Sequence, residues 1–249
     1  MLSEERYRMI LSVLSARSTA TLAELCEVIG TSESTVRRDL EHLAKAGMLK
    51  KVRGGAMSIQ AVGVYKEANV EEKMNIAADE KEAIAKYAAS TINKNDFVFI
   101  DAGTTTERMI EHITERDVTF VTNGFIHAHL LARRGFRVIL TGGEVKASTE
   151  ALVGVSCVEA IKNYNFTKCF LGTNGISAQC GLTTPEIDEA SVKRAAAEQS
   201  YVTYILADSS KFGKNSAVTF ADIRKVCIIT DKLPDNKYKD LTIIKEVDK

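Results

Sequence analysis

Four short apolar runs of this 249-residue sequence end in glycine, threonine or asparagine, residue types that suit an anion-binding pocket. If the runs are parallel strands, their endings lie along one edge of a sheet, where open α/β folds bind ligands. Behind FVFID, a glycine and three threonines precede a helical segment, so N–H groups and hydroxyls can gather at a helix N-terminus. One such ending is most often a turn, but four together predict a phosphate pocket. The endings are DAGTTT (Asp101–Thr106), TNG (Thr122–Gly124), TGGE (Thr141–Glu144) and GTNG (Gly172–Gly175).

Two lysines in the second half of the chain could offset the charge of such an anion. Lys193 lies on an expected helix one turn after Glu189, and Lys211 lies in the loop DSSKFG behind a strand. A Glu–Lys pair at this spacing is most often surface decoration. The same pair could instead serve a sugar-phosphate isomerase, with Glu189 as base and Lys193 as its electrostatic partner. The sequence contains neither a GxxxxGK loop nor a GxGxxG loop, so it gives nucleotide binding no direct support.

Two adjacent arginines, Arg37 and Arg38 in the stretch STVRRDL, could contact nucleic acid. Helical periodicity places them on the same side as Ser34 and opposite an apolar stripe, so they face outward. Their helix follows a short turn after another helix, which is the position of a recognition helix, and arginine can bond guanine or clamp a phosphate. An ordinary charged surface is the alternative. The segment from Val36 to Arg53 holds two acids against six basic residues, which are Arg37, Arg38, Lys45, Lys50, Lys51 and Arg53.

Three short helices and a hairpin are expected to carry these arginines. Apolar residues repeat with helical spacing from Tyr7 to Leu14, from Leu22 to Ile29 and from Val36 to Leu43. Gly47 ends the third helix, and MLKKVRGGAMSI is typical of two strands around a Gly-Gly turn at positions 54 and 55. This combination predicts a winged helix-turn-helix.

The remainder of the sequence predicts a different architecture. Runs rich in Val, Ile and Phe alternate with helical segments, which is typical of βαβ units and a largely parallel sheet. We therefore expect an α/β protein in which residues 1–57 form the winged helix-turn-helix domain, 58–75 a linker, and 76–249 a Rossmann-like domain that binds the ligand. The expected strands are FVFIDAG, VTFVTNG, RVILTGG, KCFLGTNG, YVTYILAD and KVCIIT.

Composition and charge argue against several classes of protein. Lys+Arg and Asp+Glu both total 33, so any basic surface that attracts nucleic acid is local. The first ten residues carry charges where a signal peptide needs an apolar core, and no apolar run is long enough for a membrane span, so we expect a cytosolic protein. The cysteines are widely spaced without a C-x-x-C pair, and His127 and His129 are expected on different faces of a helix. We therefore expect no disulfide, no metal site and no cofactor.

The N-terminal segment resembles the DNA-binding segment of the DeoR family of bacterial transcriptional regulators. ELCEVIGTSESTVRRDLEHLAKAGMLKKVRGGA matches that family's signature nearly position for position, above all in TVRRDL and in the GGA of the wing. Ser18 and Arg53 depart from it, since glycine and histidine are frequent at these positions. The residues that we expect to contact DNA are Ser34, Thr35, Arg37, Arg38, Lys50, Lys51 and Arg53.

The second half resembles the C-terminal sensor domain of the same family through DAGTTT, VTNG, GGEV, LGTNGI, GLTTP, EASVKRA, LADSSKFG and IITD, in that order. The resemblance implies a fold related to ribose-5-phosphate isomerase and CoA transferases, and binding of phosphorylated sugars or related metabolites without turnover. Asn174 stands where aspartate is common, and its amide can donate as well as accept, which affects sugar selectivity. The residues implied to bind the effector are Asp101, Gly103, Thr104, Thr105, Thr106, Asn123, Gly142, Gly143, Asn174, Lys193 and Lys211.

These features predict a repressor of a sugar-catabolic operon, whose affinity for double-stranded operator DNA changes when a phosphorylated sugar occupies the pocket. One recognition helix per chain and two-fold operators predict a homo-oligomer, a dimer or a tetramer. Two alternatives stay open: an isomerase that uses Glu189 and Lys193, and a DNA-binding protein with a vestigial pocket. We favour the regulator over the isomerase, because a DNA-binding module adds nothing to isomerisation.

Overall fold

The computed structural model describes residues 2–17, 19–58 and 70–248. The chain divides into two compact units, Met1–Lys66 and Glu67–Lys249, and each unit has its own hydrophobic core. Most of the expected linker, residues 59–69, lies outside the described residues, as does position 18. The end of that linker, α4 (Val70–Asn75), is a helix of the second unit.

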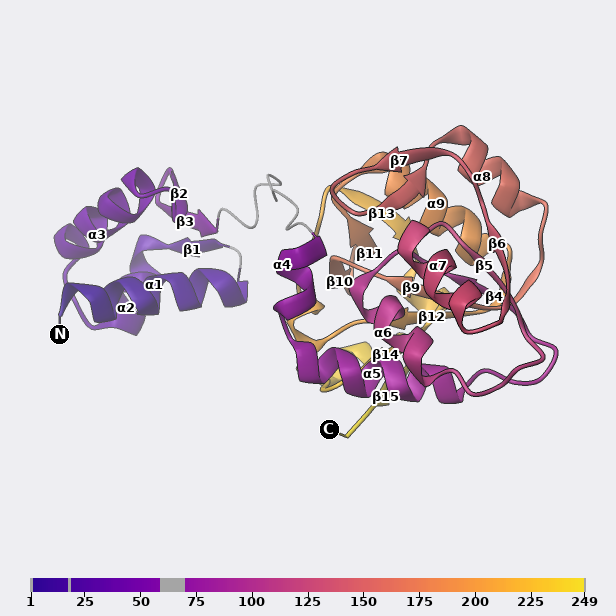
Figure 1. Ribbon diagram of the computed structural model, residues 1–249. Helices are drawn as coiled ribbons and strands as arrows, with labels where there is room; N and C mark the ends of the chain where they lie inside the picture. The colour runs from indigo at the N-terminus through magenta and orange to yellow at the C-terminus, as the bar shows by residue number, and fades with distance from the viewer. Residues whose placement is uncertain (1, 18, 59–69, 249) are drawn as a thin grey trace. The chain divides into compact units, whose positions relative to one another are not determined.

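The first unit contains the three helices and the hairpin that the sequence predicts (Figure 1). Its strands form an antiparallel sheet in the order β1-β3-β2. Strand β1 was not predicted, because three residues are too few to show an alternating pattern. The elements are α1 (Ser3–Arg17), β1 (Thr19–Thr21), α2 (Leu22–Ile29), α3 (Glu33–Lys45), β2 (Leu49–Val52) and β3 (Gly55–Ser58).

The hairpin turn lies one residue earlier than the sequence suggests. Since Val52 pairs with Gly55, the turn consists of Arg53 and Gly54, and the prediction of a Gly54–Gly55 turn was wrong. Gly54 has φ = 85°, a conformation that glycine adopts without steric cost. Gly55 lies in β3, where a Cβ atom would stand 2.2 Å from the main-chain oxygen of Ala20. The close approach of the unpredicted strand β1 therefore requires the second glycine.

A buried ion pair fixes the third helix against the first. The Arg6 guanidinium donates to both carboxylate oxygens of Asp39, at 2.6 Å and 3.0 Å, and Asp39 is only 3% exposed. Such a two-pronged bond sets orientation as well as distance. Ile10, Leu25 and Leu40 are fully buried beside it. The orientation of α3 is therefore determined by the core of its own unit.

The second unit is built around a parallel sheet of seven strands in the order β15-β14-β12-β9-β4-β5-β6 (Figure 1). All six runs predicted as strands belong to this sheet. The edge strand β15 was not predicted, because its sequence IIKE is short and half polar. The strands are β4 (Phe97–Ile100), β5 (Thr119–Thr122), β6 (Arg137–Leu140), β9 (Phe166–Gly172), β12 (Ser200–Leu206), β14 (Cys227–Thr230) and β15 (Ile243–Glu246).

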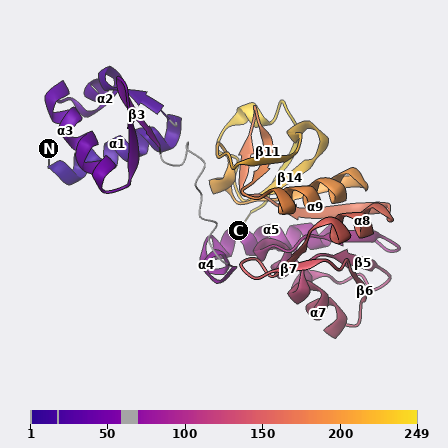
Figure 2. The same cartoon turned by 90° about the horizontal axis from the view of Figure 1, so that it is seen from above.

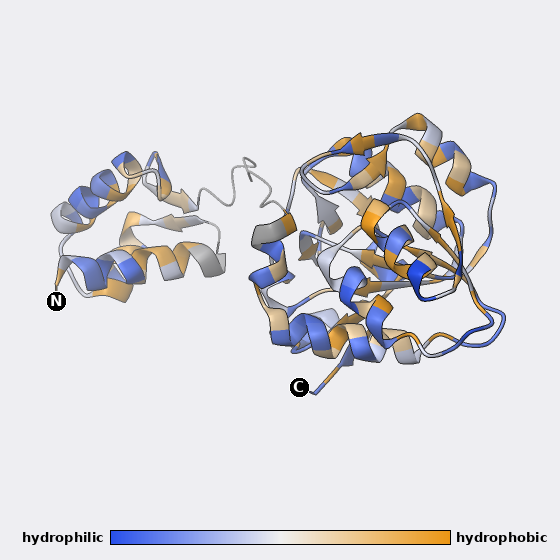
Figure 3. Ribbon diagram, viewed as in Figure 1, coloured by the Kyte–Doolittle hydropathy of each residue, from blue (hydrophilic) through white to orange (hydrophobic). Residues whose placement is uncertain are grey.

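Helices cover both faces of the seven-stranded sheet (Figure 2). Val98 and Ile100 point to the face covered by α5, α6 and α7, whereas Phe99 between them points to the face covered by α8 and α9. Figure 3 shows the strands as mostly hydrophobic and the helices as mixed, as a sheet buried on both faces requires. The helices are α5 (Ala78–Ser90), α6 (Thr104–His112), α7 (Phe125–Arg133), α8 (Val155–Lys162) and α9 (Ile187–Glu198).

Two small antiparallel sheets and three short 3₁₀ helices also occur among the described residues of the second unit. None of the five strands was predicted, because each is only three or four residues long. They form a three-stranded sheet, β10-β11-β13, and the hairpin β7-β8. The elements are β7 (Glu144–Lys146), β8 (Ala151–Val153), β10 (Gly175–Ser177), β11 (Gly181–Thr184), β13 (Val218–Ala221), η2 (Ser209–Lys211), η3 (Ile223–Lys225) and η4 (Asn236–Tyr238).

The described part of the chain contains no helix that is long and apolar enough to cross a membrane. All five cysteines are free thiols. No group of three His, Cys, Asp or Glu side chains that could hold a metal ion occurs within residues 2–17, 19–58 and 70–248. On α7, His127 is buried and His129 is exposed, as their spacing predicts.

Candidate functional site

Helix α3 presents its arginines to solvent. Val36 and Leu40 are buried in the core, whereas Arg37 and Arg38 are exposed, as the helical spacing predicts. The Arg37 guanidinium donates to Glu33 one turn earlier, at 3.0 Å from Nε. Both partners are more than half exposed, so this pair contributes little to stability and can exchange for another anion. Arg38 forms no ion pair with any residue that the structure describes.

The wing continues this positively charged surface. Lys50 and Lys51 lie on β2, an edge strand of its sheet, and Arg53 lies in the turn that follows. All three side chains are exposed and form no ion pair with another described residue. Ser34 and Thr35, at the start of α3, have their hydroxyls 3.0 Å from that of Ser32. The structure therefore leaves a set of basic side chains on α3 and on the wing available to an anionic partner.

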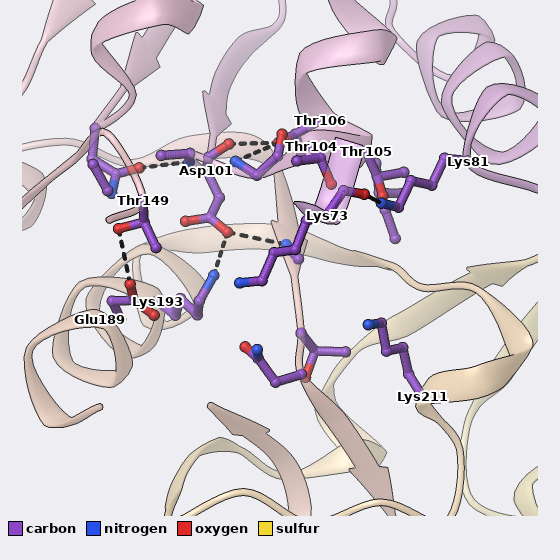
Figure 4. A pocket seen from close by; sticks show the side chains of 18 of the residues that line it. Lys73, Lys81, Asp101, Thr104, Thr105, Thr106, Thr149, Glu189, Lys193 and Lys211 are labelled. Carbon is purple, nitrogen blue, oxygen red and sulfur yellow. Dashed lines mark hydrogen bonds and ion pairs between the residues drawn. The ribbon is translucent and has the colours of Figure 1, made fainter. Parts of the chain in front are cut away.

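The second unit contains a polar pocket where the strands β4, β9 and β12 end (Figure 4). It encloses about 750 Å³, counting the solvent at its mouth. Figure 4 shows Lys73, Lys193 and Lys211 directed into the space that Asp101 and the threonines of α6 face. The lining consists of Lys73, Lys81, Asp101, Ala102, Gly103, Thr104, Thr105, Thr106, Asn123, Thr149, Ala151, Gly172, Thr173, Asn174, Glu189, Lys193, Leu206, Asp208 and Lys211.

Asp101 and Lys193 form an ion pair at the base of the pocket. Lys193 Nζ donates to Asp101 Oδ2, and the side chains are only 4% and 8% exposed. The same carboxylate oxygen accepts the main-chain N–H of Gly172, at 3.1 Å. This one oxygen atom therefore joins the end of β4, the end of β9 and α9. This burial contradicts the alternative that Lys193 is surface decoration.

The side chain of Thr106 caps part of the N-terminus of α6. The Thr106 hydroxyl lies 2.6 Å from the oxygen of Asp101 and accepts the N–H of Gly103, at 3.0 Å. The N–H groups of Thr104 and Thr105 belong to the first helical turn, where helix geometry gives them no partner. They lie at the pocket, beside the positive end of the helix dipole. This end of α6 can therefore receive an anion.

Two buried side chains hold the loop before α6 in place. Asn123 Oδ1 accepts the N–H of Ala102 at 3.0 Å, and its Nδ2 donates to the oxygen of Leu152 at 3.2 Å. His127 Nε2 lies 3.2 Å from the Thr106 hydroxyl. Burial lowers the pKa of His127 to about 4, so its ring is neutral at physiological pH. Asn123 and His127 thus shape the pocket through the backbone.

Glu189 is surrounded by hydrogen-bond donors. Its Oε1 accepts Lys146 Nζ at 2.7 Å and the Thr149 hydroxyl at 3.1 Å, and its Oε2 lies 3.2 Å from the Thr184 hydroxyl. Burial opposes ionisation, but the ammonium groups of Lys193 and Lys146 outweigh it and hold the pKa of Glu189 below its ordinary value. A carboxylate of lowered pKa is a poor general base. These contacts hold the Glu189 carboxylate in place in the lining of the pocket.

Two lysines of the pocket were missed by the sequence reasoning. Lys81 on α5 is only 5% exposed, and its Nζ donates to the main-chain oxygen of Lys73. Burial, followed by the nearby charge of Lys211, lowers the pKa of Lys81 to about 8. Both residues lie in the charged stretch VEEKMNIAADEKEA, which shows no motif. The one available signal was that Lys81 falls on the apolar side of its helix, one turn before Ala85.

Gly142 and Gly143 are not among the described residues that line the pocket. They connect β6, the last strand of the sheet, with β7, and two strands separate β6 from β9. Both glycines have positive φ, and a Cβ on Gly143 would stand 2.5 Å from the oxygen of Val153. Close packing of this turn therefore accounts for them. The other nine predicted effector residues all lie in the lining.

A winged helix-turn-helix joined to an α/β unit with a cationic pocket defines a DNA-binding regulator that senses a ligand. Comparison with known proteins agrees for both units. Residues 6–62 match the family described as the DeoR-like helix-turn-helix domain, and residues 76–232 match the DeoR C terminal sensor domain. The chain belongs to the DeoR family of transcriptional regulators.

Full-length relatives are regulators as well. The uncharacterized HTH-type transcriptional regulator FruR of Bacillus subtilis is 39% identical over 251 residues, which cover 99% of each chain. The lactose phosphotransferase system repressor of Staphylococcus epidermidis is 34% identical over 231 residues, 91% of each chain. These names describe transcriptional regulators and not enzymes. Among solved structures, ribose 5-phosphate isomerase A of Methanocaldococcus jannaschii is 13% identical with a TM-score of 0.41, and the match spans 54% of each chain.

The lowered pKa of Lys81 predicts a pH-dependent stability. Between about 8 and the ordinary 10.5, the unfolded chain keeps a proton on this amine that the folded chain has lost, so folding is favoured increasingly as the pH rises. The charged groups around it are Lys211, Asp208, Arg108 and Lys73. Denaturant unfolding at pH 7 to 10 measures the free energies of unfolding of the wild type and of Lys81→Met. The wild type should gain stability relative to Lys81→Met as the pH rises above 8.

Lys86→Met on the same helix is the matched control, because Lys86 is exposed. Its difference from the wild type should stay constant across the same pH range. A constant difference for Lys81→Met as well would mean that the Lys81 amine titrates at its ordinary pKa.

Proposed function

We propose that this protein is a repressor of a sugar-catabolic operon and that a phosphorylated sugar in the pocket of the second unit lowers its affinity for operator DNA. The observation that carries the proposal is the convergence of four lysines and the N-terminus of α6 on one pocket. The repressor sign is supported by the name of the lactose phosphotransferase system repressor, which is similar over 91% of its length. Since operators and sugar phosphates occur in the cytoplasm, we place the protein there.

Charge balance supports an anionic ligand group in the pocket. Asp101 pairs with Lys193, and Glu189 shares Lys146 with Glu186. The lysines of the lining, Lys73, Lys81, Lys193 and Lys211, outnumber its carboxylates, Asp101, Glu189 and Asp208. A phosphate group would offset this positive charge and would accept hydrogen bonds from the first-turn N–H groups of α6. We place the phosphate beside Thr104 and Thr105.

The opposite wall of the pocket suits the hydroxyls of a sugar. It carries the carboxylate of Glu189, the hydroxyls of Thr149 and Thr173, and the amide of Asn174. The Thr184 hydroxyl lies 3.1 Å from Asn174 Oδ1, which orients the amide. Donors and acceptors are thus mixed at this end, whereas cations dominate at the other. Asn174 is the residue that we expect to affect the choice of sugar, because its amide can donate as well as accept.

The first unit supplies the DNA contacts in this proposal. The exposed early residues of α3 enter the major groove, with Arg37 and Arg38 contacting bases or phosphates and Ser34 and Thr35 flanking them. Lys50, Lys51 and Arg53 of the wing contact the phosphate backbone. Operators with two-fold symmetry require two such units, so the active species is a homo-oligomer, a dimer or a tetramer.

A melting screen against sugar phosphates tests the pocket. A ligand at one hundred times its Kd should stabilise the protein by about 2.7 kcal/mol. Thr105→Val removes a hydroxyl from the phosphate end and should reduce this gain and the release of DNA. Thr203→Val is the control, because Thr203 is equally buried on β12 but does not line the pocket. If no member of the panel, including inorganic phosphate, shifts the wild-type melting temperature, the effector proposal is wrong.

Substitution of the arginines tests the DNA interface. Arg37→Ala and Arg38→Ala should each weaken binding to DNA selected in vitro with the wild type, by about 1–3 kcal/mol if the arginine bonds a base. A lost phosphate contact would instead lower the slope of log K against log salt by about one. Arg133→Ala removes the same charge from the exposed end of α7 and should change neither quantity. Wild-type DNA affinity in both α3 variants at fixed salt would contradict the assignment.

A further inference from the structure

Helix α4 contributes to the pocket although it lies outside both family matches. The matched segments end at residue 62 and begin again at residue 76, whereas α4 spans Val70–Asn75. Lys73 of this helix lines the pocket and extends toward its centre (Figure 4). It also lines a second, smaller pocket with Glu107 and His127, so it stands where the two hollows meet. In the sequence, α4 is the last element before the sensor match and follows the segment that leads from the winged helix-turn-helix unit.

The attachment of α4 to the sensor depends on two cationic side chains at its C-terminal end. Lys81 of α5 donates to the main-chain oxygen of Lys73, and Arg108 Nη2 of α6 donates to that of Met74, at 3.1 Å. The last carbonyls of a helix lack partners within the helix and carry the negative end of its dipole, so cations suit this position. None of the described α4 side chains belongs to the hydrophobic core of the unit. Hydrogen bonds to its last carbonyls thus attach α4 to α5 and α6.

The corner beside α4 carries local strain. Ala77, between α4 and α5, has φ = 53° and ψ = 46°, the left-handed region that costs a non-glycine residue about 1–2 kcal/mol. In addition, Arg108 Nε is buried without a hydrogen-bond partner among the described residues. Strained residues and unsatisfied buried donors persist where the surrounding structure holds them, and they concentrate at switch regions. Both features lie at the attachment of α4.

We propose that α4 transmits occupancy of the pocket to the DNA-binding unit: the effector's anionic group binds the ammonium groups of Lys73 and Lys81 and thereby fixes α4 on the sensor. This step rests on the proposed function, in which a phosphorylated ligand enters the pocket. An ammonium group has three donors, so Lys81 can hold the Lys73 oxygen and the anion at the same time. The anion also favours the charged form of Lys81, which strengthens its bond to α4. Because α4 follows the segment leading from the first unit, its fixation changes the constraint on that unit.

Lys211 provides a matched comparison. It lines the same pocket from η2 and adds the same charge, but η2 is far from α4 in the sequence. Loss of Lys211 should therefore weaken anion binding without affecting the response of α4 at saturation. Loss of Lys73 should remove both an anion contact and the response.

The test uses the full chain, with inorganic phosphate as the probe and chloride at matched ionic strength as the control. Melting curves measure phosphate binding, and hydrogen exchange of the amides of residues 70–76 measures fixation of α4. In the wild type, saturating phosphate should slow this exchange by about tenfold, which corresponds to about 1.4 kcal/mol. Phosphate should also lower the affinity for the selected DNA.

The variants separate transmission from binding. Lys211→Ala should require more phosphate yet show the full slowing and the full release of DNA at saturation. Lys73→Ala and Lys73→Met should still be stabilised by phosphate, but without slowed exchange at α4 and with little release of DNA. Since Lys73→Met keeps most of the aliphatic chain, agreement between the two Lys73 variants assigns the effect to the ammonium group.

The failures are distinguishable. If phosphate and all sugar phosphates leave the wild-type melting temperature unchanged, the proposed function itself fails. If phosphate stabilises the wild type but exchange at residues 70–76 does not slow, or if Lys73→Ala and Lys211→Ala behave alike at saturation, the pocket stands and the role of α4 is overturned.

Discussion

The pocket depends on the ion pair between Asp101, at the end of β4, and Lys193 on α9. Removing one partner of a buried pair leaves an uncompensated charge and costs about 3–5 kcal/mol. The Asp101 carboxylate also accepts the N–H of Gly172, so a single group joins the ends of two neighbouring strands to a helix on one face of the sheet. The pair thus fixes the elements that surround the ligand space, and it does so with charges that cancel.

Because the charges of Asp101 and Lys193 cancel, the character of the pocket depends on Glu189 and on the other lysines. Glu189 is held by Lys146, Thr149 and Thr184, and its pKa is lowered by the ammonium groups that outweigh its burial. Both of its oxygens lie within hydrogen-bond distance of other groups of the protein. The lysines of the pocket lining, on α4, α5, α9 and η2, outnumber the carboxylates of the lining. Such a site suits the anionic ligand that we propose, and a ligand-binding pocket accords with membership in a family of regulators.

The sequence allowed the fold and most of the pocket to be predicted, because both depend on patterns with a fixed period or position. Helical spacing predicted the exposure of Arg37 and Arg38, and the ends of parallel strands predicted that Asp101 and Asn174 would meet. The contributions of Lys73 and Lys81 could not be predicted, since they depend on how two helices cross the pocket and not on a motif. The Arg6–Asp39 pair was invisible for the same reason, because its partners are 33 residues apart. Gly142 and Gly143 were predicted from a strand ending, but they are not among the described residues that line the pocket, and two strands separate β6 from β9.

A small ligand can change the position of a structural element only if the contacts that hold this element are weak. A helix of six residues does not form on its own in water, so the position of α4 depends on its tertiary contacts. Those contacts include hydrogen bonds from Lys81 and Arg108, and the left-handed backbone of Ala77 lies beside them. Each tenfold preference of a ligand for one of two arrangements shifts their balance by about 1.4 kcal/mol, which is comparable with the cost of that single strained residue. A deeply packed helix would need far more ligand binding energy to respond. The weak attachment of α4 is therefore the condition under which one anion could change the arrangement of the chain that leads to the DNA-binding unit.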